Sequence, residues 1–219
     1  KDKMSLVESD WLEKNISNVK IIDCSWHMPQ TKRDGFEEYK HQHIPNSIFF
    51  DLDNNSKKTT DLPHMLVDIK DWEKIVSKMG IKQNDEIIIY DNSDVISSCR
   101  CWYNFIYFGH NSNLVHVLNG GLGKWIKEKK EVTNNKTNIK KSSYKGIEKK
   151  ELVKNKKSIN QNVDEQKFKL IDARSIDRFK GNIPEPRKGL KSGSIKNSFC
   201  IPFNYCLNED KTFKKKEDL

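Results

Sequence analysis

The chain has 219 residues, with 40 lysines and arginines against 31 acidic residues and a formal net charge of +9. This length suits one large domain or two of ordinary size and can bury a core without covalent cross-links. No stretch approaches the roughly 18 apolar residues of a membrane span, and the N-terminus does not resemble a signal peptide. Five cysteines at irregular spacing do not form a disulfide framework. We therefore expect a soluble, cytoplasmic protein with reduced thiols and no membrane segment.

Two segments of the chain recur later at nearly the same offset. Residues 19–23 (VKIID) correspond to 168–172 (FKLID), and 43–47 (HIPNS) correspond to 194–198 (SIKNS), at offsets of 149 and 151 residues. The first pair has the pattern of a buried strand that ends in Asp, and the second pair leads into another apolar strand. The sequence therefore predicts one fold unit followed by the first part of a second copy.

Helical and strand patterns alternate after the first repeat. The spacing predicts, in chain order, a helix over 71–79, a buried strand over 86–90, an aromatic-rich helix over 97–108 and a strand over 114–118. This alternation favours an α/β fold with mostly parallel sheets flanked by helices. Ligands of such sheets bind at the carboxyl ends of the strands, so a site in the first copy is expected in the loop after Tyr90.

The net charge is concentrated in one segment. Residues 124–157 hold thirteen lysines and four glutamates, so the rest of the chain is close to neutral. Between 127 and 162 there is no arginine, and Tyr144 is the only aromatic residue. A nucleic-acid footprint would combine arginines and stacking aromatics with the positive charge. We therefore interpret 127–162 as a lysine-rich linker and expect no nucleic acid among the partners.

Arginine is rare in this chain, with five arginines against 35 lysines. Three of the five, Arg174, Arg178 and Arg187, lie within fourteen residues. A guanidinium grips a carboxylate with a rigid fork, whereas an ammonium is a hydrated point charge. We expect Arg174 to make an internal ion pair, and Arg178 and Arg187 to be free of one and to form an anion site. The Pro-Glu-Pro sequence before Arg187 should hold that residue on a stiff loop.

Several short motifs occur together along the chain. They are IIDCSW at 21–26, EYKHQHIP at 38–45, FFDLD at 49–53, HML at 64–66, LNGG at 118–121, and RFKGNIPEPR at 178–187. Together they resemble the tandem-domain sulfurtransferases, the family of rhodanese and 3-mercaptopyruvate sulfurtransferase, and the resemblance runs from about residue 9 to 210.

The resemblance implies two rhodanese-like α/β domains, of which the first is non-catalytic and the second carries a catalytic cysteine, with the active site at their interface. We accordingly expect a non-catalytic domain over 1–126, the linker over 127–162 and the first half of the catalytic domain over 163–219.

The resemblance also implies roles for four residues. Asp53 and His64 match the catalytic acid–histidine pair of the mercaptopyruvate branch, and Arg178 and Arg187 match the positions that bind the donor's carboxylate and carbonyl. From spacing alone, His64 would be a core or capping histidine and Asp53 a turn or N-cap residue. A 2-oxo acid presents a planar carboxylate that suits two guanidinium groups, and removal of its sulfur requires a proton transfer in which histidine can assist.

The implied enzyme moves sulfane sulfur from 3-mercaptopyruvate to a cysteine and then to a thiol or cyanide acceptor. Thioredoxin is a candidate acceptor, and no cofactor is implied. A thiosulfate-using enzyme, rhodanese itself, is the alternative, because the two branches differ mainly in the catalytic loop.

No cysteine of this chain is expected to carry the sulfur. A persulfide-forming thiol needs the backbone N–H groups of a tight loop at a helix N-terminus. In the first copy this loop begins with Asp91, which cannot form a persulfide. In the second copy it would lie roughly 20 residues past Leu219 if the repeat offset holds. The five cysteines are interpreted as packing residues, and no spacing predicts a metal site.

The chain opens at Lys1 without an initiator Met and ends in a charged run, which we interpret as the mark of a fragment. We expect this fragment to be inactive by itself. A function of another class stays open: a truncated, non-catalytic binding module whose basic linker contacts an acidic partner.

Overall fold

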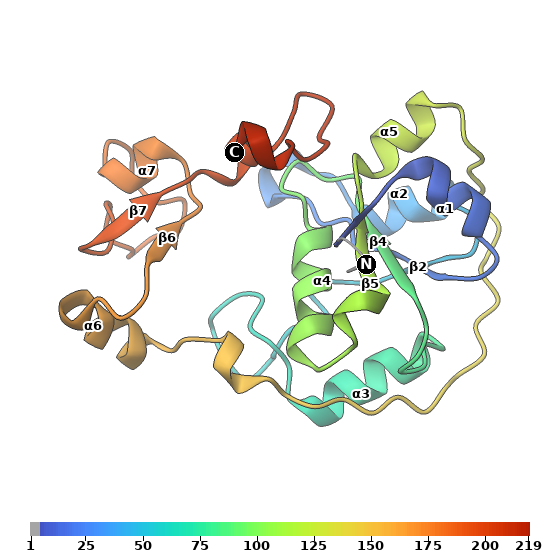
Figure 1. Cartoon of the computed structure of the whole chain (residues 1–219), viewed down its shortest axis with the longest axis horizontal. Coiled ribbons are helices and arrows are strands. Elements are labelled where there is room, and N and C mark those ends of the chain that lie inside the picture. The colour runs from blue at the N-terminus through green and yellow to red at the C-terminus, as the bar shows by residue number, and fades with distance from the viewer. Residues whose placement is uncertain (1–4) are drawn as a thin grey trace. The chain divides into compact units, whose positions relative to one another are not determined.

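The structure, a computed structural model, describes residues 5–219 and divides into two units (Figure 1). The first unit runs to Lys150, and the second runs from Glu151 to Leu219. This division differs from the predicted bounds 1–126, 127–162 and 163–219, because much of the predicted linker packs onto the first unit.

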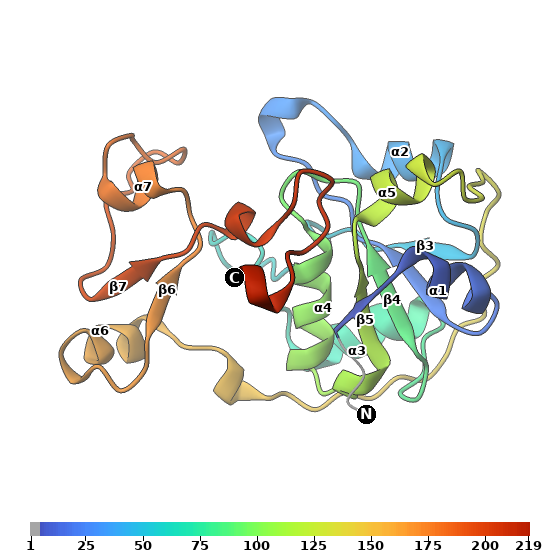
Figure 2. The ribbon, with the colours of Figure 1, turned by 45° about the horizontal axis from the view of Figure 1, so that its top comes forward.

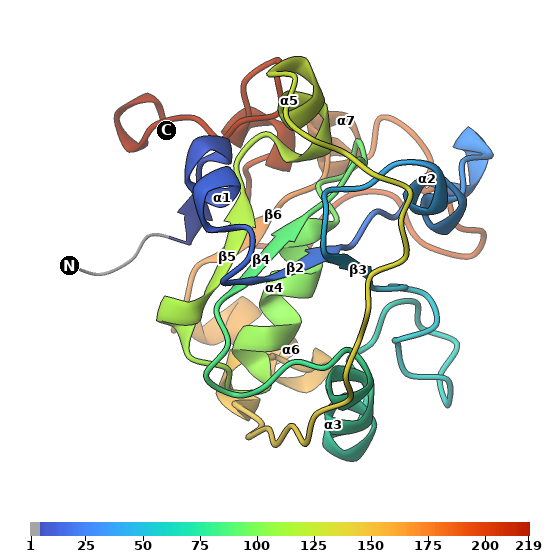
Figure 3. The ribbon, with the colours of Figure 1, turned by 90° about the vertical axis from the view of Figure 1, so that its right-hand side faces the viewer.

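The first unit is built on a sheet of five parallel strands in the order β1-β5-β4-β2-β3 (Figure 3). The strands predicted over 19–23, 86–90 and 114–118 are all present, and each begins one residue later than expected. The predicted α/β fold with a parallel sheet flanked by helices is confirmed. The strands are β1 (Leu6–Val7), β2 (Lys20–Asp23), β3 (Ser47–Phe49), β4 (Ile87–Tyr90) and β5 (Val115–Leu118).

Helices cover both faces of this sheet. Ile87 and Ile89 of β4 share one core cluster with residues of α3 and α4, whereas Ile88 and Tyr90 share a second cluster with residues of α1 and α5. All four side chains are buried, which explains why β4 is apolar at every position. No helix among the described residues is long and apolar enough to cross a membrane. The helices of this unit are α1 (Ser9–Asn15), α2 (Gly35–His41), α3 (Ile69–Lys78), α4 (Ser98–Tyr107) and α5 (Gly121–Lys127).

The second unit contains a parallel pair of strands joined through a short helix (Figure 2). The pairing of β6 with β7 repeats that of β2 with β3, since Asp172 lies opposite Cys200 as Asp23 lies opposite Phe49. An asparagine with left-handed backbone precedes the second strand of each pair, Asn46 at φ +67° and Asn197 at φ +63°. The predicted internal repeat is therefore confirmed in backbone geometry. The elements are α6 (Lys156–Glu165), β6 (Leu170–Asp172), α7 (Ile176–Lys180) and β7 (Ser198–Cys200).

Residues 131–149, here named the basic strap, follow an extended path along the first unit (Figure 3). Thr133 and His43 exchange backbone hydrogen bonds of 2.8 and 2.9 Å. Tyr144 is 2% exposed and belongs to the core cluster of α3 and α4, and its hydroxyl lies 3.0 Å from Nδ1 of His110. This part of the predicted linker is therefore held on the first unit by a few residues between its exposed lysines.

Candidate functional site

The predicted pair Asp53 and His64 is brought together in the first unit. Nε2 of His64 lies 2.6 Å from Oδ1 of Asp53, and the indole N–H of Trp26 donates to both oxygens of the same carboxylate at 3.1 Å. The Trp26 and His64 rings contact edge to face at 5.0 Å. The Asp53 side chain is 65% exposed and that of His64 is 26% exposed. The pair is thus accessible from solvent, and the carboxylate fixes one edge of the imidazole.

The backbone at His64 is held in an unusual conformation. Its φ of +54° lies in the left-handed region, which costs a non-glycine residue on the order of 1 kcal/mol or more. The guanidinium of Arg100, on α4, donates Nη2 to the carbonyl oxygen of His64. Burial lowers the pKa of Arg100, and its Nε has no hydrogen-bond partner among residues 5–219. Arg100 was not among the predicted site residues, because its partner is a backbone carbonyl 36 residues away that no sequence pattern marks.

The loop after β4 begins with Asp91, as expected, and its carboxylate binds the loop's own backbone. Oδ1 accepts the N–H of Ser93 at 3.0 Å, and Oδ2 accepts the N–H of Ser98, the first residue of α4, at 2.8 Å. Asp91 is only 5% exposed. The Asp91 carboxylate therefore occupies one N–H group in the loop and one at the helix start, where an anionic sulfur could otherwise be stabilised.

A second carboxyl group lies beside this loop, at the end of β2. The Asp23 carboxyl group accepts hydrogen bonds from the N–H of Ser25 at 2.9 Å and from the Ser25 hydroxyl at 2.6 Å. The side chain is almost fully buried, and this burial, reinforced by the negative charge of Asp91, raises the pKa of Asp23 to about 7.

Two of the three arginines in the second unit are tied to one carboxylate. Arg174 pairs with Asp172 at 2.6 Å and with Glu185 at 2.7 Å, so the internal ion pair expected for Arg174 is present. Arg178 also binds Glu185, through Nη2 and through Nε at 3.2 Å. The expectation that Arg178 makes no internal ion pair is wrong, because the Glu185 side chain is only 5% exposed and lies between the two guanidinium groups.

Arg187 differs from its two neighbours. It is exposed and makes no ion pair with any carboxylate in residues 5–219. Glu185 precedes it by two residues and is anchored by Arg174 and Arg178, so the loop that presents Arg187 is fixed next to it. The predicted role of Arg178 and Arg187 in substrate binding stays a prediction.

The cysteines have the character of packing residues. Cys24 and Cys101 are fully buried, and burial raises the pKa of the Cys24 thiol. Burial likewise raises the pKa of Cys99 to about 12, so this thiol carries almost no thiolate at neutral pH. Within the described part of the chain, no group of three or more His, Cys, Asp or Glu side chains is arranged to hold a metal ion.

The chain matches known proteins over most of its length. Residues 8–128 match the rhodanese-like domain family. The chain is 36% identical to "Thiosulfate/3-mercaptopyruvate sulfurtransferase 1, mitochondrial" from Arabidopsis thaliana, over 98% of this chain and 62% of the plant protein. It is 30% identical to the 3-mercaptopyruvate sulfurtransferase of Mus musculus, over 98% of this chain and 74% of the mouse protein. The chain therefore spans a little under two thirds of the plant relative's length.

A solved structure shows the same similarity in three dimensions. SseA from Escherichia coli, described as a 3-mercaptopyruvate sulfotransferase, superposes with a TM-score of 0.88 at 26% sequence identity. The match covers 99% of this chain and 81% of SseA.

Proposed function

Since this chain belongs to the rhodanese family, we propose that it supplies the donor-binding residues of a sulfurtransferase that acts on 3-mercaptopyruvate. The sulfur of the donor passes to a cysteine as a persulfide, and the C–S bond breaks to leave pyruvate. The persulfide sulfur is then handed to a thiol, with thioredoxin as one candidate, or to cyanide. We assign this role to none of the five cysteines of the chain; burial raises the pKa of Cys24 and of Cys99, which favours their neutral thiols.

The state of the arginines carries this proposal. Arg174 and Arg178 are bound to Glu185, whereas Arg187 offers an unpaired guanidinium on the same loop. An unpaired guanidinium suits the planar carboxylate of a small oxo acid, because its rigid fork forms two parallel hydrogen bonds when one side chain is ordered. Arg178 keeps N–H groups beyond those used by Glu185, and its side chain is 33% exposed, so it can contact the donor's carbonyl.

The Asp53–His64 pair favours a mercaptopyruvate donor over thiosulfate. When the C–S bond breaks, the carbon that loses sulfur must take up a proton, whereas thiosulfate leaves as sulfite without protonation of carbon. A histidine oriented by a carboxylate is suited to move this proton. The chemistry therefore assigns Asp53 and His64 a role that a thiosulfate enzyme does not need.

The anion site can be tested by measuring binding to the 219-residue chain. Pyruvate and 3-mercaptopyruvate should bind in isothermal titration, and Arg187→Ala should weaken binding by about tenfold or more, because a charged hydrogen bond is lost. The melting temperature should stay nearly unchanged, since Arg187 makes no ion pair with any carboxylate of residues 5–219. Mercaptopyruvate should remain intact during the titration, as judged by the absence of released pyruvate.

Lys188→Ala is the matched control, because it removes an exposed positive charge next to Arg187. Equal weakening by both variants would indicate only a general attraction of anions and would contradict a defined site. A fall in melting temperature with no change in affinity would make Arg187 a structural residue. If thiosulfate binds more tightly than pyruvate and Arg187→Ala abolishes this binding, the rhodanese alternative is supported. No binding of any donor would favour a non-catalytic binding module.

We propose the cytoplasm as the compartment of this protein. The Arabidopsis relative is named as mitochondrial, so the mitochondrion is the alternative compartment. Imaging of the tagged gene product in its own cells would distinguish the two compartments.

A further inference from the structure

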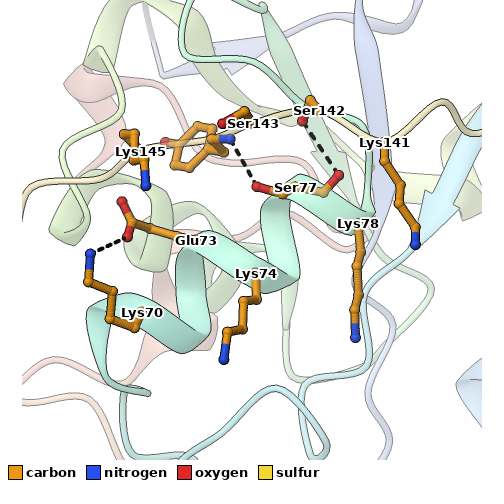
Figure 4. A pocket seen from close by; sticks show the side chains of 10 residues that line it. Lys70, Glu73, Lys74, Ser77, Lys78, Lys141, Ser142, Ser143 and Lys145 are labelled. Carbon is orange, nitrogen blue, oxygen red and sulfur yellow. Dashed lines mark hydrogen bonds and ion pairs between the residues drawn. The ribbon is translucent and has the colours of Figure 1, made fainter.

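A groove lies between helix α3 and the basic strap, and none of the residues that line it has a role in the proposed donor site (Figure 4). Its volume is about 370 Å³. Five lysines line it together with the Glu73 carboxylate, three serines and Tyr144. The lysines are Lys70, Lys74 and Lys78 from α3 and Lys141 and Lys145 from the basic strap.

The lysines form two rows of similar length. Those of α3 are four residues apart, so they lie on one helix face at steps of about 6 Å. Lys141 and Lys145 lie on an extended segment whose four steps span about 13 Å. An extended peptide places alternate side chains at about 7 Å on one face, which closely matches the spacing along the helix. The two rows are therefore spaced to meet carboxylates of one extended chain.

The walls of the groove are fixed to each other. The Ser142 hydroxyl donates to the carbonyl oxygen of Ser77 at 3.5 Å, and the N–H of Tyr144 donates to the Ser77 hydroxyl at 2.9 Å (Figure 4). The Ser142 hydroxyl also lies 2.5 Å from the carbonyl oxygen of Ile81, just after α3. The Tyr144 side chain anchors the basic strap in the core. The groove therefore exists before any ligand arrives, and binding does not require the basic strap to become ordered.

Most of the positive charge in the groove is uncommitted. Lys74, Lys78 and Lys141 make no ion pair with any carboxylate of residues 5–219, and their ammonium groups point away from Glu73 (Figure 4). Glu73 is engaged by the N–H of Gly146 at 3.0 Å and by Lys70 at 3.3 Å. These contacts lower the pKa of Glu73 and leave its charge compensated inside the wall. Five lysines and one glutamate give the lining a net charge of +4.

We propose that this groove binds an extended acidic segment of a partner protein. A nucleic acid fits less well, because no arginine lines the groove and its only aromatic ring, that of Tyr144, is buried and cannot stack on a base. A small anion also fits less well, because the uncommitted ammonium groups are distributed along the groove and do not converge on one point. This site is separate from the proposed donor site and does not depend on the identity of the sulfur donor.

The proposal is tested by fluorescence anisotropy with a labelled peptide of alternating Glu and Ala. The 219-residue chain should bind it, and a Gln-Ala peptide of the same length should not bind. Lys74→Gln combined with Lys141→Gln removes one ammonium from each row and should weaken binding by about tenfold, which corresponds to about 1.4 kcal/mol. Binding should also weaken when salt is raised from low to physiological concentration, because the charges are exposed.

The matched control is Lys127→Gln combined with Lys136→Gln, which makes the same change in net charge at exposed lysines outside the groove. This control should bind the peptide with the affinity of the parent chain. Both double variants should have the melting temperature of the parent chain. Equal weakening in both double variants would show that only the overall charge attracts the peptide and would overturn the proposal. Tighter binding of a single-stranded thymidine oligonucleotide, lost in the groove variant alone, would assign the groove to nucleic acid and would also overturn it.

Discussion

Individual residues of the first unit differ in how their charge is compensated. Asp91 shares its carboxylate between two backbone N–H groups, whereas Asp23 receives two hydrogen bonds from Ser25 and lies close to the charge of Asp91. Asp172, which corresponds to Asp23 in the repeat, is paired with Arg174 instead, and its pKa is lowered chiefly by that hydrogen-bonded pair. The carboxylate at this turn is thus buried without a cationic partner among the described residues in one copy and is paired with a guanidinium in the other.

This difference predicts a pH dependence of stability. The folded pKa of Asp23 is raised to about 7, above the value of about 3.9 in an unfolded chain, so the folded state holds the proton more tightly. The contribution of Asp23 is fully present below about pH 4 and is lost as the pH rises through about 7. The resulting loss in the free energy of unfolding is on the order of a few kcal/mol. Asp23→Asn should remove it, so that the free energy of unfolding varies less between about pH 4 and 7.

Urea unfolding at several pH values measures this effect. Asp61→Asn, at an exposed position, serves as the control and should leave the pH profile of the parent chain unchanged. An Asp23→Asn profile that keeps the parent's slope would show that Asp23 is already ionised in the folded chain near pH 5.

The sequence was informative about site residues where a motif match was available. Asp53 and His64 were predicted as a pair through their resemblance to a family pattern, and they lie in contact. Arg178 was expected to be free of an internal partner, but Glu185 lies in the loop after α7, which ends at Lys180, so no regular spacing indicated this ion pair. Arg100 was missed for the same reason, since long-range contacts with backbone carbonyls leave no periodic signal.

At the scale of elements, the basic strap shows where composition misleads. A lysine-rich segment with few apolar residues has the composition of a solvated linker. Here a few positions are enough to hold the basic strap on the first unit. The surface that the basic strap crosses contains glycines, and because these lack a Cβ, the two backbones can come into contact. A Cβ on Gly80 would lie 2.5 Å from the carbonyl oxygen of Lys140, and one on Gly109 would lie 2.8 Å from that of Ile147. The regular strands and helices were predicted well because their apolar periodicity reflects burial directly.

Gly80→Ala should therefore destabilise the first unit by roughly 1–3 kcal/mol, since Gly80 has a φ of +71° and its new Cβ would displace the basic strap. Urea unfolding followed by tryptophan fluorescence provides the measurement. Gly123→Ala is the control, because Gly123 lies in α5 with no atom within 4 Å of the new Cβ. That variant should be neutral or stabilising by up to about 1 kcal/mol. Similar losses in both variants would mean that the close backbone approach at Gly80 is unimportant.

At the scale of the whole molecule, the two units differ in how much apolar surface they bury. The two core clusters lie within the first unit, and the sheet of the second unit has two strands among the described residues. An isolated pair of strands is at best marginally stable in water. Several large apolar side chains of the second unit are more than 40% exposed: Ile171, Ile195, Phe199, Ile201, Phe203 and Tyr205.

Hydrogen exchange should reveal this difference directly. Amides of β6 and β7 should exchange at least about 100-fold faster than those of β2 and β4, because local opening of the second unit exposes little additional apolar surface. Mass spectrometry of the 219-residue chain at two concentrations provides the measurement. If β6 and β7 are as well protected as β2 and β4 at both concentrations, the expectation is contradicted. If the protection of β6 and β7 grows with protein concentration, self-association covers these side chains.

The carboxylate of Asp91 has a further consequence for how a repeated fold evolves. It accepts backbone N–H groups at the start of α4 and so preserves the hydrogen bonding that shapes the loop. An acid at this position therefore shapes the loop without offering a thiol that could carry sulfur. After a gene duplication, a change of one codon to aspartate can make one copy non-catalytic while selection preserves its fold.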